Sequence, residues 1–85
     1  MAGFYHPPIK RSVEIAGHKT SVSLEPLFWG MLNNAAKRHG LPINALVAQI
    51  DAERIAAVTP PGLATAIRLW VVADLVAAMP HSADR

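Results

Sequence analysis

Polar and apolar side chains alternate along residues 11–24, on both sides of the dipeptide Ala16-Gly17. A period of two predicts strands, and Ala16-Gly17 would join them if it forms a two-residue turn. The turn would place Ile15 opposite His18 and set the register of the remaining pairs. The apolar face would then carry Val13, Ile15, Thr20 and Val22, and the polar face Ser12, Glu14, Lys19, Ser21 and Ser23.

The pattern changes to a helical spacing after Glu25-Pro26, where proline suits the first position of a helix. A first helix should follow and end at Gly40, which can adopt the left-handed conformation of a helix stop. A second helix should begin at Leu41-Pro42 and end before the breaker residues 59–62. A third should run from Leu63 to about Met79, and it is apolar on most of its circumference.

This short chain has few ways to stabilise itself. Its 85 residues contain no cysteine, which excludes disulfides and thiolate metal sites. An isolated pair of strands is marginal, and the simplest additional partner for a strand is its own copy. We therefore expect a homodimer that is mostly α-helical with a short β ribbon. We divide the chain into a flexible lead-in at 1–10, one domain at 11–79 and a tail at 80–85.

Residues 19–26, together with Phe28-Trp29, Leu32, Ala36, Gly40 and residues 44–47, resemble the ribbon-helix-helix fold of the Arc and MetJ type repressors. Residues 11–13 with the run 17–25 look more closely like a branch of short, uncharacterised bacterial ribbon-helix-helix proteins. The resemblance implies a ribbon-helix-helix homodimer with an additional C-terminal helix. It also implies a dimeric DNA-binding transcription regulator that inserts an intermolecular antiparallel ribbon into the major groove.

The resemblance also implies roles for particular residues. Base contacts fall by position on Lys19, Ser21 and Ser23, whose side chains can donate or accept hydrogen bonds. Phosphate contacts fall on the backbone of Ile43 and Asn44 at the start of the second helix, joined by Lys10 and Arg11. The dimer core would comprise Val22, Leu24, Phe28, Trp29, Leu32, Leu46, Val47, Ile50 and Trp70.

Two alternatives remain open. In the first, residues 11–16 fold back on residues 19–24, and Glu14 then lies opposite Lys19 on the face that would contact bases. The sheet of the dimer would then have four strands and be wider than the two-stranded ribbon that the major groove admits. The apolar third helix and the modest charge favour a second alternative, a protein–protein interaction or antitoxin-like dimerisation module that does not read DNA with its ribbon. Its apolar C-terminal helix would bind the protein partner.

Charge and composition narrow the classes of function that remain for this protein. Residues 1–40 carry five cations against two carboxylates, a net charge of +3, whereas residues 41–85 carry −1. This weak asymmetry favours an anionic partner such as double-stranded DNA. Arg68 and Asp74 interrupt the apolar third helix, so we expect no membrane span and a cytoplasmic protein. We expect Arg68 to form an ion pair. No catalytic constellation, metal site or cofactor motif is visible, so we do not expect an enzyme.

Overall fold

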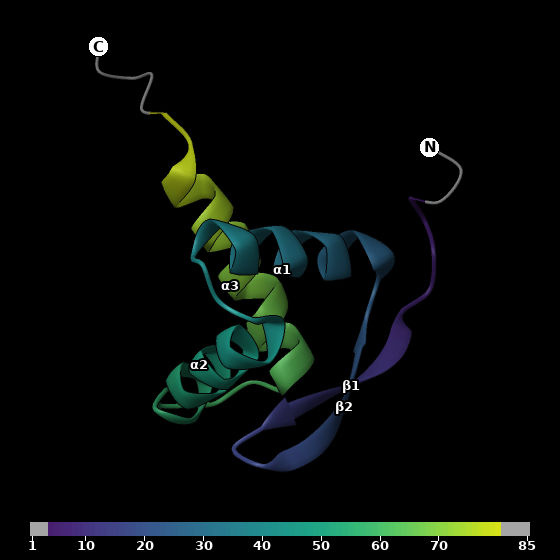
Figure 1. Ribbon diagram of the computed structural model, residues 1–85, viewed down its shortest axis with the longest axis vertical. Helices are drawn as coiled ribbons and strands as arrows, with labels where there is room; N and C mark the ends of the chain where they lie inside the picture. The colour runs from purple at the N-terminus through teal and green to yellow at the C-terminus, as the bar shows by residue number, and fades with distance from the viewer. Residues whose placement is uncertain (1–3, 81–85) are drawn as a thin grey trace.

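The computed structural model describes residues 4–80, which form a two-stranded antiparallel sheet followed by three helices (Figure 1). The elements are β1 (Ile9–Ile15), β2 (His18–Leu24), α1 (Pro26–Arg38), α2 (Ile43–Ile55) and α3 (Leu63–Ala78). The predicted order of a ribbon followed by three helices is confirmed. Residues 1–3 of the expected lead-in and 81–85 of the expected tail lie outside the described residues.

The hairpin has the register that the alternation predicts. Ile15 pairs with His18 across the turn, and Glu14 pairs with Lys19. Both turn residues have positive φ, 51° at Ala16 and 84° at Gly17. Positive φ at both central positions defines a type I′ turn, whose twist matches that of the strands it joins.

β1 begins at Ile9, two residues before the predicted start at Arg11. A contact from far along the chain explains the difference, because the indole Nε1–H of Trp29 donates to the Ile9 carbonyl at 2.9 Å. Ile9 also pairs with Leu24 and packs against the core. Lys10 therefore belongs to the strand and not to the lead-in.

Proline and glycine set the limits of the helices. Pro26 is the first residue of α1, and after the end of that helix Gly40 has a φ of 66°. Lys37 and Arg38 lie in the last turn of α1, where positive charge favours the helix dipole. Pro42 directly precedes α2 as its N-cap. α3 ends at Ala78, one residue before the predicted end.

The helices cover one face of the sheet and enclose a core of 13 buried apolar residues. The sheet contributes Val13, Val22 and Leu24, and α3 contributes Ala66, Ile67 and Val71. Of the nine residues predicted for a dimer core, seven are buried within this single chain, and Phe28 and Trp70 pack partly buried against them. The third helix is thus part of the domain and supplies much of the cover that its neighbours need.

Ion pairs join the helices at their exposed margins. Arg68 of α3 donates two hydrogen bonds to the Glu25 carboxylate, at 2.9 and 3.2 Å, which confirms the expected ion pair. Asp74 of α3 accepts a hydrogen bond from Arg38 at 2.7 Å, and its other oxygen lies 2.8 Å from His39 Nε2. The hydrogen bond from Arg38 lowers the pKa of Asp74, and burial only partly opposes it. Among residues 4–80, no helix is long and apolar enough to cross a membrane.

Candidate nucleic-acid interface

The face of the hairpin that points away from the helices is entirely polar. Three cross-strand pairs build it, Lys10 with Ser23, Ser12 with Ser21 and Glu14 with Lys19. All are exposed except Ser23, which is partly buried. The three residues predicted to contact bases therefore share one surface with three residues of β1. We call these six residues the outward face.

The residues predicted to contact phosphates are separated by the structure. Lys10 lies on the outward face, beside Ser23 at the end of the hairpin. Its neighbour Arg11 projects from the opposite face, and its guanidinium carbon lies 5.1 Å from the centre of the Trp29 ring. Successive strand residues point to opposite faces, so only one of two consecutive cations can join the polar surface.

The start of α2 lies against the outer edge of β1. Asn44 accepts a hydrogen bond through Oδ1 from the Glu14 backbone N–H, with an N–O distance of 3.1 Å. The Asn44 side chain thus satisfies one backbone group at that edge. Ile43 and Asn44, the predicted phosphate residues of the second helix, are therefore next to the strand residue that carries the one carboxylate of the outward face.

The outer edge of β2 is open. Ile15 and His18 flank the turn as a hydrogen-bonded pair, so every second residue of β2 bonds to β1. The intervening residues Lys19, Ser21 and Ser23 direct their N–H and C=O groups away from β1, and no other residue within 4–80 bonds to these groups. An edge of this kind can accept a further strand.

The cationic side chains of the helices and those of the ribbon differ in their ion pairing. On the helices, Arg38, Arg54 and Arg68 each pair with a carboxylate within 4 Å, whereas Lys37 of α1 pairs with none of the described residues. On the ribbon, Lys10, Arg11 and Lys19 pair with no carboxylate of the described residues at that distance, although Glu14 lies across from Lys19. Three of the four Lys and Arg residues that lack a carboxylate partner within the described chain thus lie on the hairpin.

A family model described as a ribbon-helix-helix domain matches residues 8–75, which include both strands and most of α3. The chain belongs to the ribbon-helix-helix family. Ribbon-helix-helix domains are typically DNA-binding regulators, and members of the family generally form dimers. No curated protein and no solved structure matches the chain. In this ribbon-helix-helix domain, the ribbon of one chain is a complete hairpin. Among the described residues, the outer edge of β1 receives one hydrogen bond and the outer edge of β2 receives none.

Sequence reasoning placed Lys19, Ser21 and Ser23 on the face where they lie, but it left Ser12 out of the candidate site. The same period of two carried that information, because Ser12 lies directly across from Ser21. The hydrogen bond between Glu14 and Asn44 has no comparable signal, since it joins residues 30 positions apart.

Proposed function

We propose that this protein is a homodimeric DNA-binding transcription regulator in which the β2 strands of two copies pair antiparallel. The open edge of β2 carries this proposal, because it lies directly beside the outward face and the unpaired cations of the hairpin. This role places the protein in the bacterial cytoplasm and requires neither a catalytic site nor a cofactor.

The backbone parity of β2, together with pairing of all three residues that point to the open edge, suggests one register for the dimer. Lys19, Ser21 and Ser23 point their backbone groups at the open edge, so these residues form the hydrogen-bonded pairs. Ser21 then lies opposite its copy at the two-fold axis, and Lys19 lies opposite Ser23 of the other chain. Three such pairs exchange about six hydrogen bonds. On the inner face, Thr20 of one copy meets Val22 of the other and extends the apolar core.

The dimer would contain a four-stranded sheet in the order β1, β2, β2 and β1. Its outer strands lie about 14 Å apart at the usual strand spacing, whereas the major groove of B-DNA is about 12 Å wide. We therefore propose that the central β2 pair enters the groove and the β1 strands lie over the bordering backbones. Lys19, Ser21 and Ser23 then meet base edges, while Lys10 and Ser12 meet phosphates.

The first test is the oligomeric state of Ser21→Pro. This change removes an N–H at the open edge, where a strand tolerates proline, and leaves the bonds to β1 in place. The matched control is Ser12→Pro, which removes an N–H at the outer edge of β1. By sedimentation equilibrium, Ser21→Pro should lose pairing through β2 and Ser12→Pro should retain it. Equal association of both variants and the wild type would refute pairing through β2.

The second test is salt-dependent binding to duplex DNA. Affinity should fall steeply with salt, and Lys19→Ala should weaken binding. Glu14→Gln removes a carboxylate from the outward face and should tighten binding roughly three- to tenfold in the dimer. Glu53→Gln removes an exposed carboxylate of α2 at its groove with α3, and as the matched control it should change nothing. Absence of binding to random and genomic duplexes at about 50 mM salt would refute a DNA-reading role.

The exposed apolar surface of α3 favours a second candidate function, a protein–protein interaction or antitoxin-like dimerisation module that does not read DNA with its ribbon. Four large apolar residues on this helix are more than two-fifths exposed before its end at Ala78. In that case DNA binding is absent at every salt concentration, while association persists.

A further inference from the structure

Glu14 and Lys19 form the one oppositely charged pair of the outward face. They lie directly across from each other, one on each strand, and both are exposed. Because Ile15 and His18 form the hydrogen-bonded pair beside the turn, Glu14 and Lys19 form a non-hydrogen-bonded pair, in which the two side chains lie closer together. No salt bridge within 4 Å joins their head groups. Both head groups are therefore available to a ligand that lies over the outward face.

The backbone of Glu14 is held from a second side. Its N–H donates to Oδ1 of Asn44 in α2 at 3.1 Å, so the residue is anchored between β2 and α2. A carboxylate here repels the phosphates of DNA and lowers the affinity for every duplex. The affinity falls least where a hydrogen-bond donor faces the carboxylate. Glu14 is therefore suited to discriminate between sequences and not to add affinity.

We propose that Glu14 and Lys19 together read a C·G base pair in one orientation. This inference rests on the proposed function, in which β1 lies over one DNA backbone and β2 over the bases beside it. From that backbone inward, a row across the sheet meets first Glu14 and then Lys19. Cytosine on the nearer DNA strand presents its N4 amino group, a donor, to Glu14. Its guanine partner presents the O6 acceptor to Lys19.

The other three arrangements of a base pair do not match this order of groups. Guanine on the nearer strand places its N7 acceptor before Glu14. Adenine there places N7 before Glu14 and its N6 donor before Lys19. Thymine places its methyl group and O4 acceptor before Glu14. Only cytosine on the nearer strand gives both side chains a hydrogen-bonding partner.

The two-fold axis of the proposed dimer repeats this contact. In the proposed register Ser21 lies at the axis, so Lys19 and its copy are offset by the four residues from Lys19 to Ser23, about 13 Å along the strands. This offset corresponds to roughly three to four base-pair steps. The preferred duplex then carries C·G at one end of this interval and G·C at the other. The serines between them tolerate several bases, since a hydroxyl can donate or accept.

The test begins with the full wild-type chain and a pool of duplexes that have a randomised central segment. Duplexes selected at about 50 mM salt should be enriched in the inverted C·G and G·C pairs. One selected duplex is then compared, by fluorescence anisotropy, with a copy in which both pairs are reversed. Reversal keeps the base composition and the central O6 acceptor for Lys19, but it replaces the donor before Glu14 with N7. The wild type should bind the reversed duplex roughly tenfold more weakly or worse.

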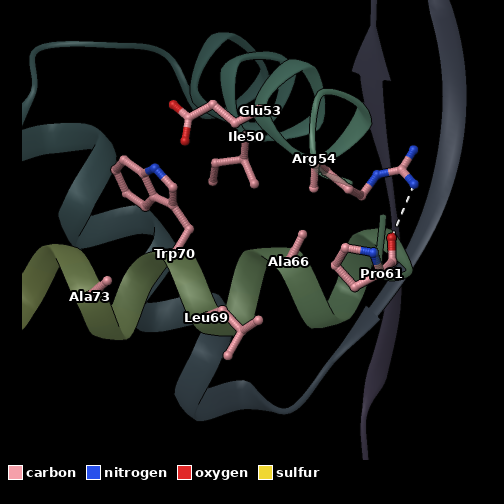
Figure 2. Close-up of a pocket in the computed structure, with 9 residues that line it drawn as sticks. Ile50, Glu53, Arg54, Pro61, Ala66, Leu69, Trp70 and Ala73 are labelled. Atoms are coloured by element: carbon pink, nitrogen blue, oxygen red, sulfur yellow. Dashed lines mark hydrogen bonds between the residues drawn. The ribbon is translucent and has the colours of Figure 1, made fainter. Parts of the chain in front are cut away.

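Glu14→Gln supplies an amide that can either accept or donate, so this variant should bind the two duplexes with affinities within about threefold of each other. It should also bind random duplexes more tightly than the wild type. The matched control is Glu53→Gln, which makes the same change at an exposed side chain of α2 beside the groove with α3 (Figure 2). This control should keep the full preference of the wild type. Circular dichroism verifies that both variants retain its helical content.

Selected duplexes that lack the inverted pairs would overturn the inference, and so would equal affinity of the wild type for the original and reversed duplexes. A preference that Glu14→Gln leaves intact would assign the reading to other residues and would overturn it as well. In these three outcomes the protein still binds DNA, so the proposed function stands. Absence of binding to every duplex would instead refute the proposed function and this inference with it.

Discussion

Replacement of Ala16 by asparagine should stabilise the hairpin. Ala16 has a φ of 51°, in the left-handed region where an alanine Cβ crowds the following carbonyl at a cost of about 1–2 kcal/mol. Asparagine adopts this conformation more readily, and Asn-Gly is the preferred pair for a type I′ turn. Ala16 is exposed, so its replacement disturbs no packing. We expect Ala16→Asn to raise the free energy of unfolding by about 0.5–1 kcal/mol.

Urea unfolding at one fixed protein concentration measures this change, because association also contributes to stability. The melting temperature should rise by roughly 2–8 °C for a domain of this size. Gly17→Ala should have the opposite effect, since a φ of 84° is unfavourable for any residue with a Cβ. Ala45→Asn, on the exposed surface of α2, is the control and should be slightly destabilising. An Ala16→Asn variant with an unchanged or lower midpoint would refute the turn geometry.

The remaining predictions concern the contacts that attach β1 and α3. Trp29→Phe removes the hydrogen-bond donor to the Ile9 carbonyl and should destabilise the domain by about 1–3 kcal/mol. Amide hydrogen exchange at the start of β1 should become faster. Unchanged protection of these amides would contradict the role of this hydrogen bond. Acid should weaken the domain, because hydrogen bonds and ion pairs hold the pKa values of Glu25 and Asp74 below their ordinary 4.5 and 3.8. A carboxyl group whose pKa is lower in the folded state stabilises the fold fully at pH values above its ordinary pKa. This stabilisation is lost as the pH falls through the pKa of the folded state. The urea midpoint of the wild type should therefore decrease between pH 7 and pH 2, and the urea midpoint of the Asp74→Asn variant should decrease less.

The outward face was accessible from sequence because it depends on local rules. A period of two places Lys19, Ser21 and Ser23 on one face of a strand, and a two-residue turn at Ala16-Gly17 fixes their partners. The limits of the helices were equally local, since Pro26 and Gly40 act through their own backbone conformations. Such signals need no knowledge of the tertiary fold.

Tertiary structure decided what each of these side chains can do. The sequence by itself predicted the order of strands and helices and the register that a turn at Ala16-Gly17 would give, and its residues carried the family resemblance. Only the fold showed that Arg11 lies over Trp29, that Asn44 bonds to the edge of β1, and that Arg68 is neutralised by Glu25. These contacts join residues between 18 and 43 positions apart, so no local pattern encodes them. The tertiary contacts also give partners to the Glu14 N–H, to Arg38 and to Arg68, whereas the outer edge of β2 and the cations of the ribbon have none among the described residues.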